Sequence, residues 1–221
     1  MPQTPKNKEL VIATKNAGKA REFALLFEPF GIVARCLNDY PQIPDIPEEG
    51  ETFADNALTK AKTVAELLGV PALADDSGLC VDALDGRPGV YSARYAGPGA
   101  KDADNNAKLL RELELLAEAG RLAVESAAAD GREVRLLSPA RFVCSLALYD
   151  PHSPPVQVEG QCEGFVIDTL IGENGFGYDP LFYMAEFGQT MAQLPMTRKN
   201  EISHRSRALA KLQELLRESE A

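Results

Sequence analysis

The stretch Leu10–Phe27, LVIATKNAGKAREFALLF, decides the fold class of this 221-residue chain. It begins with a short apolar run that ends at Ala13, which is typical of a buried strand. A polar turn follows, and apolar residues then recur at helical spacing at Phe23, Leu26, Phe27 and Phe30. The pattern predicts a strand, a loop and a helix in succession, which is a building unit of α/β proteins.

The alternation of strands and helices continues along the first third of the chain. Residues 32–37 (IVARCL) predict a second strand, and residues 40–51 carry three prolines in seven residues, which predicts an extended loop. A helix is expected from Thr52, which can cap it, to Gly69, which closes it. The buried strand PALAD, residues 71–75, follows, and a double aspartate is expected at its carboxyl end.

The second half of the chain predicts a late hairpin and a final helix. Residues 140–150 (ARFVCSLALYD) and 155–168 (PVQVEGQCEGFVID) are expected to be strands joined by the turn PHSPP, and Ser203 is expected to cap the last helix. Residues 120–139 are the least legible, and a helix, a hairpin and an insertion all stay open there. Early alternation with a late hairpin predicts a mixed α/β sheet.

Composition excludes several classes of protein. The formal net charge of -10 argues against a nucleic-acid polymer as partner, because such partners require a basic surface. Four dispersed cysteines and two histidines offer little for a zinc site. The polar N-terminus does not resemble a signal peptide, and no segment approaches the roughly 18 apolar residues that span a membrane. We therefore expect a cytoplasmic protein with reduced cysteines.

The turn after the first strand, Thr14–Lys19, is a candidate phosphate site. Backbone N–H groups at a helix N-terminus attract phosphate, and Lys19 would add a full charge. The P-loop pattern nevertheless fails, because Ala13 stands where its first glycine would be and Ala20 stands where Ser or Thr would follow the lysine. An ordinary solvated turn with a surface lysine remains the alternative.

Acidic residues form a candidate metal site. Asp75 and Asp76 follow a buried strand, and Glu48 lies in the proline-rich loop. Mg²⁺ is usually held by one or two carboxylates together with substrate phosphates, and Ser77 could donate to a phosphate oxygen. The alternative is that Asp75 caps a turn and Asp76 is solvated. Asn56 and Lys60, at i,i+4 spacing, are a further hint, although a polar helix face is commonly just solvated.

The last third of the chain offers groups suited to a nucleobase. The glycine-rich segment Phe176–Asp179 could stack an aromatic ring on a base. Lys199 follows, and His204 and Arg205 are expected in the first turn of the last helix, where cations oppose the helix dipole. Such placement indicates an anion or a keto group to contact. Together with the phosphate turn and the acids, these residues predict a nucleotide pocket.

Six motifs occur in an order that resembles the inosine triphosphate pyrophosphatase family, over about residues 10–216. They are Thr14-x-Asn16-x-Gly18-Lys19, Thr52-Phe53-x-x-Asn56-Ala57, Ala74-Asp-Asp-Ser-Gly78, Pro88-Gly-Val-Tyr-Ser-Ala-Arg94, Gly175-Phe-Gly-Tyr-Asp-Pro180 and Ser203-His-Arg205. The resemblance implies an elongated mixed β-sheet flanked by helices, with two lobes and a central cleft. It implies a single two-lobed domain over residues 1–221, with 120–139 as a candidate insertion, and a homodimer.

The resemblance also implies Mg²⁺-dependent hydrolysis of ITP, dITP and XTP to the monophosphate and pyrophosphate, which cleanses the nucleotide pool. Glu48 and Asp76 match the metal-associated acids, and Asp76 and Lys19 match catalytic positions. The positions that match substrate contacts are Thr14, Lys15, Asn16, Ala17, Gly18, Lys19, Ser77, Phe176, Gly177, Tyr178, Asp179, Lys199, His204 and Arg205.

A mechanism follows as a hypothesis. Asp76, or Asp75 beside it, would orient the attacking water, and Lys19 would stabilise charge on the leaving pyrophosphate. A donor such as Arg205 would donate a hydrogen bond to the keto oxygen of hypoxanthine or xanthine, and it would disfavour adenine, which presents an amino donor at that position. The Phe176–Asp179 loop would reject guanine, because its backbone would approach the base too closely to admit the 2-amino group. The alternatives are a pyrophosphatase for modified pyrimidine nucleotides and a nucleotide-binding module without catalysis.

Overall fold

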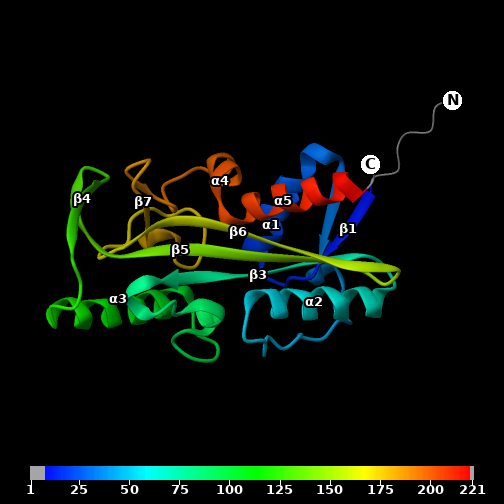
Figure 1. Ribbon diagram of the computed structural model, residues 1–221, viewed down its shortest axis with the longest axis horizontal. Helices are drawn as coiled ribbons and strands as arrows, with labels where there is room; N and C mark the ends of the chain where they lie inside the picture. Colours follow the sequence, from blue (N-terminus) through cyan, green and yellow to red (C-terminus); the bar gives the residue numbers. More distant parts are fainter. Residues whose placement is uncertain (1–7, 220–221) are drawn as a thin grey trace. The chain divides into compact units, whose positions relative to one another are not determined.

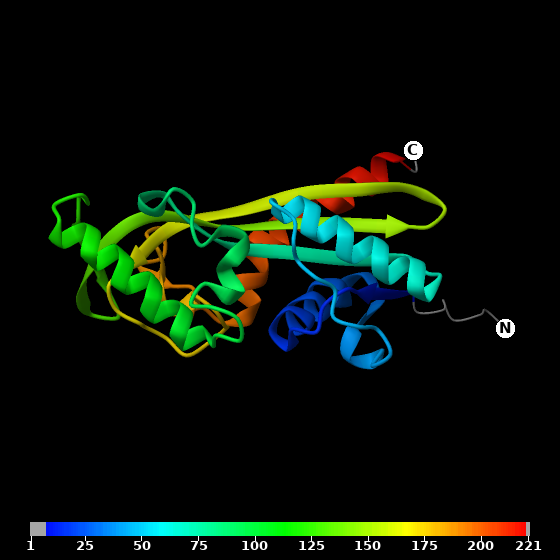
Figure 2. The same ribbon diagram turned by 90° about the horizontal axis from the view of Figure 1, so that it is seen from below.

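The computed structural model describes residues 8–219 (Figures 1 and 2). Its strands are β1 (Lys8–Ile12), β2 (Ile32–Cys36), β3 (Ala72–Val81), β4 (Glu125–Ala129), β5 (Arg132–Asp150), β6 (Ser153–Ile167), β7 (Phe182–Met184) and β8 (Gln189–Thr190). Its α-helices are α1 (Ala17–Phe27), α2 (Phe53–Leu68), α3 (Asp102–Glu118), α4 (Met196–Ile202) and α5 (His204–Ser219). None of the helices in this part of the chain has the length and hydropathy to cross a membrane.

The strands form one open sheet in the order β2-β1-β3-β5-β6-β7-β8, with β4 paired to β5. β1 pairs in parallel with β2 and with β3, whereas the β4–β5, β6–β7 and β7–β8 pairs are antiparallel. The prediction of a mixed α/β sheet flanked by helices is therefore confirmed.

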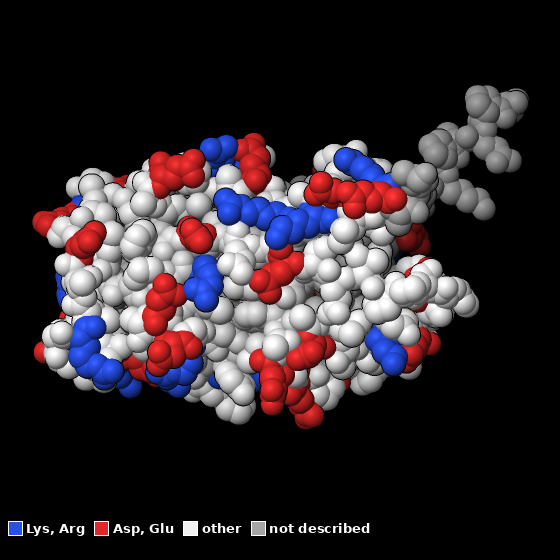
Figure 3. Space-filling model, viewed as in Figure 1, with Lys and Arg blue, Asp and Glu red and all other residues white. Residues whose placement is uncertain are grey.

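Acidic and basic side chains are interspersed on the face drawn in Figure 3.

The described chain divides into two compact units, and each is discontinuous in sequence. Unit 1 contains residues 8–76, 145–159 and 208–219, and unit 2 contains residues 77–144 and 160–207. Each has a hydrophobic core of its own. The core of unit 1 is built from Val11, Ala13, Leu37, Ile43, Ala57, Ala61, Val64, Ala65, Ala72, Ala74 and Ala147. The larger core of unit 2 includes Leu79, Leu109, Leu113, Phe142, Tyr178 and Phe182.

The topology of unit 1 places β1 at a switch point. The chain leaves β1 for β2 on one side through α1 and then returns to β3 on the other side through α2. Because parallel crossovers are right-handed, this reversal puts α1 and α2 on opposite faces of the sheet, as Figure 1 shows. Ligands of open α/β sheets bind at the carboxyl ends of strands at such a point.

Helix α2 follows its sequence signals closely. Thr52 Oγ1 accepts the backbone N–H of Asp55 at 3.1 Å, so the predicted cap is confirmed. The apolar stripe of the helix is buried, and Gly69 ends the helix in the left-handed conformation, with φ 66°. A residue with a Cβ would be strained at this position, which explains the choice of glycine.

Residues 120–139, for which three possibilities stayed open, form mostly a β-hairpin. β4 and β5 are joined by Asp130 and Gly131, whose φ values are 53° and 69°. Two successive positive φ values with an Asp-Gly pair are the signature of a tight hairpin turn. Ala129 and Val134 from this hairpin pack with Ile167 in a small buried cluster of unit 2.

Several sequence-based boundaries were wrong. The strand expected from residue 140 already begins at Arg132, and the second strand ends at Cys36 rather than Leu37. Helix α1 ends at Phe27, and Phe30 lies in a following 3₁₀ turn with half of its surface exposed. The turn expected over PHSPP is only Pro151 and His152, because β6 already begins at Ser153. Strand β3 continues through the double aspartate to Val81 instead of ending there. The carboxylates can occur within a strand because lysines face both of them, as the site geometry explains.

Candidate active site

The turn after β1 is built by its own side chains. Asn16 is the N-cap of α1, and its Oδ1 accepts the backbone N–H groups of Gly18 at 2.8 Å and Lys19 at 3.1 Å. Thr14 Oγ1 accepts the N–H of Asn16 at 3.1 Å. The turn thus presents a helix N-terminus at the carboxyl end of β1, the setting that favours an anion. Asn16 already occupies two of the amide groups expected to face phosphate.

Other residues of the turn lie at the surface. Lys15 and Ala17 are exposed, and the Lys15 Nζ pairs with Asp45 Oδ1 at 2.6 Å. An exposed pair of this kind contributes little to stability. The Lys19 side chain, by contrast, is only 14% exposed and reaches Asp75 Oδ1 at 2.7 Å, where the aspartate side chain is fully buried. Of the two lysines in the turn, Lys19 is therefore the one that contacts the double aspartate.

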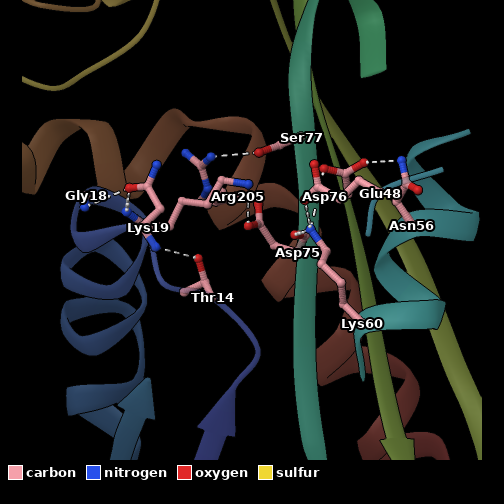
Figure 4. Close-up of polar contacts among 11 residues, drawn as sticks. Thr14, Gly18, Lys19, Glu48, Asn56, Lys60, Asp75, Asp76, Ser77 and Arg205 are labelled. Atoms are coloured by element: carbon pink, nitrogen blue, oxygen red, sulfur yellow. Dashed lines mark hydrogen bonds and ion pairs between the residues drawn. The ribbon is translucent and has the colours of Figure 1, made fainter. Parts of the chain in front are cut away.

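The two adjacent aspartates point in opposite directions. Side chains alternate along a strand, so Asp75 faces Lys19 of α1 whereas Asp76 faces α2 (Figure 4). Asn56 Nδ2 donates to Asp76 Oδ2 at 3.0 Å, and Lys60 Nζ lies 3.6 Å from Asp76 Oδ1. Repulsion between neighbouring carboxylates is therefore offset by a separate partner for each.

Lys60 joins the proline-rich loop to β3. Its Nζ lies 2.7 Å from Glu48 Oε1 and donates to the backbone oxygen of Asp75, also at 2.7 Å. Since Lys60 contacts both Glu48 and Asp76, the two carboxylate oxygens cannot be farther apart than these contact distances combined. We call Lys19, Glu48, Asn56, Lys60, Asp75 and Asp76 the acidic cluster. Three carboxylates oppose two ammonium groups in it.

Burial and charge set the pKa values in the acidic cluster. Burial raises the pKa of Asp76 above its ordinary value of 3.8, and this exceeds the opposing effect of Lys60 and Lys19. Burial lowers the pKa of Lys60, but the nearby carboxylates, led by Asp76 and Glu48, raise it by more than burial lowers it. The pKa of Lys60 therefore lies above its ordinary value of 10.5. Lys60 is therefore a fixed positive charge, as expected for an ammonium that several acids surround.

The cluster suits a hard divalent cation. Within residues 8–219 there is no group of three or more His, Cys, Asp or Glu residues placed to hold a metal ion. Two carboxylates, Glu48 and Asp76, nevertheless match Mg²⁺, which takes oxygen ligands and completes its shell with waters and substrate phosphates. The excess negative charge of the cluster points the same way.

A second group of predicted residues gathers in unit 2. Lys199 Nζ pairs with Asp179 Oδ2 at 2.8 Å, and both side chains are buried. Lys199 and Arg205 lie over the Phe176 ring, with the Nζ and Cζ atoms 5.8 Å and 5.3 Å from its centroid. Arg205 also donates to Ser77 Oγ at 2.7 Å (Figure 4). We call Ser77, Phe176, Asp179, Lys199 and Arg205 the aromatic cluster.

The remaining predicted residues have distinct surroundings. Ser203 Oγ accepts the N–H of Ser206 at 3.2 Å, which confirms it as the cap of α5 and puts His204 and Arg205 in the first turn. The buried His204 ring stacks on Phe142, with centroids 5.0 Å apart. Tyr178 is a core residue whose hydroxyl donates to the Ser92 backbone oxygen at 2.9 Å, and burial raises its pKa.

Two members of the acidic cluster carried only a weak sequence signal. Asn56 and Lys60 occur at i,i+4 spacing on a polar face that sequence alone could equally assign to solvent. Both side chains are buried in the structure. The signal that could have identified them is the pairing of a lysine and an amide at one-turn spacing directly after a segment rich in acids.

Comparison with known proteins shows the family to which the chain belongs. Residues 10–215 match the model of the Ham1 family, so the chain belongs to that family. It is 51% identical over 207 residues to a Geobacillus kaustophilus protein named dITP/XTP pyrophosphatase, covering 94% of this chain and 93% of that protein. The resemblance inferred from the motifs is thereby confirmed.

Two solved structures are similar over almost their whole length. The Ham1 protein of Staphylococcus aureus has a TM-score of 0.76 and 37% identity, with 96% of this chain and 100% of that chain covered. A HAM1 protein from Coxiella burnetii has a TM-score of 0.77 and 39% identity, with 96% and 99% covered. The fold is thus that of the Ham1 proteins.

Proposed function

We propose that this protein hydrolyses dITP, ITP and XTP to the nucleoside monophosphate and pyrophosphate. Relatives that share about half of its residues over nearly their whole length, such as the Geobacillus kaustophilus protein, are named dITP/XTP pyrophosphatases. The observation that carries the proposal is the acidic cluster beside a helix N-terminus. It combines Lys19 for phosphate charge with two carboxylates, Glu48 and Asp76, that share a single lysine.

Lys19 and the α1 N-terminus would bind the triphosphate. Hydrolysis between the α- and β-phosphates places new negative charge on the departing pyrophosphate, and a largely buried ammonium such as that of Lys19 stabilises this charge well because it is already in position. The ion pair with Asp75 holds the Lys19 side chain beside this turn. We therefore assign Asp75 the role of orienting Lys19, and Asp76 the role of orienting the attacking water.

Glu48 and Asp76 would hold Mg²⁺. When bound, the cation neutralises phosphate charge and polarises the phosphoanhydride. Lys60 keeps the two carboxylates together and limits their mutual repulsion, and Asn56 fixes the rotation of the Asp76 carboxylate through its 3.0 Å hydrogen bond. These contacts preorganise the acids, so that little free energy is spent on arranging them when substrate arrives.

The aromatic cluster would recognise the base. Phe176 offers a ring for stacking, and the guanidinium of Arg205 offers N–H donors to a 6-keto oxygen. Adenine presents an amino donor at the same position, and two facing donors leave both without an acceptor, which is costly when they are buried. Hypoxanthine and xanthine are therefore favoured over adenine.

Three further features belong to the same proposal. The two units belong to a single domain, since the two clusters follow one another directly in the chain at Asp76 and Ser77. The protein acts in the cytoplasm on the nucleotide pool and needs no nucleic-acid polymer or membrane. It functions as a homodimer, which size-exclusion chromatography with light scattering would test.

The decisive experiment is a panel of nucleotides assayed for pyrophosphate release. ITP, dITP, XTP, ATP, GTP and a modified pyrimidine triphosphate are each supplied with Mg²⁺ and with a chelator. We expect rapid release from the first three with Mg²⁺ only. Preference for the pyrimidine, release of inorganic phosphate alone, or binding of ITP without hydrolysis would each overturn the proposal.

A further inference from the structure

The loop that carries Phe176 has no regular structure to hold it. Residues 168–178 follow β6 without forming a helix or strand. Gly175 and Gly177 have φ values of 84° and 63°, in the left-handed region that favours glycine. A ring that stacks on a base must keep a fixed direction, and a segment with two such glycines does not fix that direction by itself. The direction must come from contacts outside the loop.

Those contacts anchor three successive peptide groups. The N–H of Phe176 donates to Asp179 Oδ2 at 3.0 Å, and the N–H of Gly177 donates to Asp102 Oδ2 at 2.7 Å. The carbonyl of Gly177 accepts from Asn106 Nδ2 at 3.0 Å. The two peptide groups that flank the Phe176 Cα are therefore both fixed by carboxylates, and together they fix the direction in which its side chain leaves the backbone.

Two of the three anchors come from one helix. Asp102 lies in the first turn of α3 and Asn106 lies one turn later, at i,i+4, so both point to the same side of the helix. They hold the two polar groups of a single residue, Gly177. Gly177 has no side chain, and nothing lies within 4 Å of where its Cβ would be. Its backbone groups are thus the features that α3 contacts.

We propose that Asp102 and Asn106 are positioning residues for recognition of the base. This rests on the proposed function, because it assigns these residues to the loop that would stack on hypoxanthine and exclude the 2-amino group of guanine. They act through Gly177, and they set the position of Phe176 without touching the nucleotide. Neither residue belongs to the predicted site.

A simpler role for Asp102 must be separated from this one. An acidic residue in the first turn of a helix stabilises the helix through its dipole, whatever else it contacts. Asp104 provides a matched control, because it lies in the same turn, is also exposed and accepts the N–H of Lys101 at 2.9 Å rather than a group of the Phe176 loop. Replacing either aspartate removes the same charge from the same helix end.

The kinetic test compares Asp102→Ala, Asp102→Asn and Asp104→Ala with the wild type. A charge-assisted hydrogen bond is lost in Asp102→Ala, so we expect KM for ITP to rise about ten-fold with kcat within about two-fold, and the ratio of ITP to GTP hydrolysis to fall. Asp102→Asn keeps an acceptor oxygen and should be intermediate. Asp104→Ala should match the wild type. Equal behaviour of the two alanine variants would overturn the proposal.

A second readout does not depend on catalysis. Hydrogen exchange at the amides of Phe176 and Gly177 should be faster in Asp102→Ala than in Asp104→Ala, and unchanged exchange would overturn the anchoring itself. If the wild type fails to hydrolyse ITP, the proposed function fails while this comparison still decides whether α3 anchors the loop.

Asn106 is tested by Asn106→Asp, which keeps the shape but turns an acceptor towards the Gly177 carbonyl. We expect a higher KM for ITP, and a value within about two-fold of the wild type would remove Asn106 from the proposal. If this buried variant does not fold, the exposed Asp102 variants decide the matter.

Discussion

The acidic cluster of unit 1 and the aromatic cluster of unit 2 both bury a lysine against an aspartate, but they balance charge differently. Lys19 and Lys60 face three carboxylates in unit 1. In unit 2 the buried cations Lys199 and Arg205 accompany the single carboxylate of Asp179. The first cluster thus carries more negative than positive charge, which suits a metal ion, whereas the second carries more positive than negative charge and several N–H groups, which suit a keto oxygen.

The difference teaches how one chain divides two tasks. Phosphate chemistry needs strong charges in fixed positions, and unit 1 supplies them from a strand, two helices and the proline-rich loop. Base recognition needs a flat ring and directed donors; in unit 2 the donors come from α4 and α5, whereas the ring comes from a loop that neighbouring residues must hold in place. Substitutions in the acidic cluster should therefore act on catalysis and stability, and those in the aromatic cluster on selectivity.

The largest expected effect is on Asp76. Asp76→Asn keeps the size and the contact with Asn56 but removes the negative charge needed to orient water and hold Mg²⁺. We expect kcat for ITP to fall about a thousand-fold with the protein still folded. Steady-state kinetics with ITP and Mg²⁺ measure it, with Asp45→Asn, an exposed partner of Lys15, as the control. Near-normal turnover in Asp76→Asn would remove this residue from the catalytic role.

The next effect is on stability, at Lys60. Lys60→Met removes the ammonium shared by Glu48 and Asp76 and leaves the buried Asp76 carboxylate facing the partly exposed Glu48 carboxylate. We expect a loss of about 3 kcal/mol in the free energy of unfolding without divalent cations. Added Mg²⁺ should stabilise the variant more than the wild type, because the cation then replaces the lost charge.

Lys62→Met is the matched control for Lys60. It lies on the same helix, but it is half-exposed and pairs only weakly with Glu66, at 4.0 Å. Urea unfolding with and without Mg²⁺ compares the two variants. If Mg²⁺ gives Lys60→Met no extra stability, Glu48 and Asp76 do not share an ion.

In the aromatic cluster the expected effect is on base selectivity. Arg205→Ala removes the donors assigned to the 6-keto oxygen, so the preference for ITP over ATP should fall about a hundred-fold, chiefly through lost activity on ITP. Arg207→Ala is the control, since this exposed arginine on the same helix donates only to the Gln161 backbone at 3.0 Å. A preserved preference in Arg205→Ala would place base reading elsewhere.

Local patterns predicted much of the fold because they act over a few residues. The helical stripe of α2 with Thr52 and Gly69, and the capping of α5 by Ser203, depend on spacing and backbone conformation alone. Asp130-Gly131 also encodes its hairpin, but the flanking strand ESAAA lacks β-branched residues, so the sequence left that segment open.

The parts that sequence could not predict depend on long-range partners. Two adjacent aspartates look like the end of a strand, and only the lysines from α1 and α2 explain why β3 continues through them. The burial of Lys60 and the contact of Asp102 with Gly177, 75 residues away in sequence, likewise arise from tertiary packing. For the candidate site, the motifs predicted the residue types, whereas only the three-dimensional structure shows that these residues divide into two clusters.

The smallest expected effect tests how unit 2 buries a titratable thiol in its hydrophobic core. Burial raises the pKa of the Cys162 thiol from 9.0 to about 11, only partly opposed by Arg207. The folded protein then holds this proton more tightly than the unfolded chain does. The contribution of the thiol is therefore fully present below pH 9 and is lost as pH rises through 11. Near pH 10.5 the loss should be about 2 kcal/mol. The decline in unfolding free energy from pH 8 to pH 10.5, measured by urea unfolding, should thus be steeper in the wild type than in Cys162→Ala. Parallel declines would mean that the thiol is not desolvated, and the contrast between a charged cluster in unit 1 and a neutral core in unit 2 would then weaken at this residue.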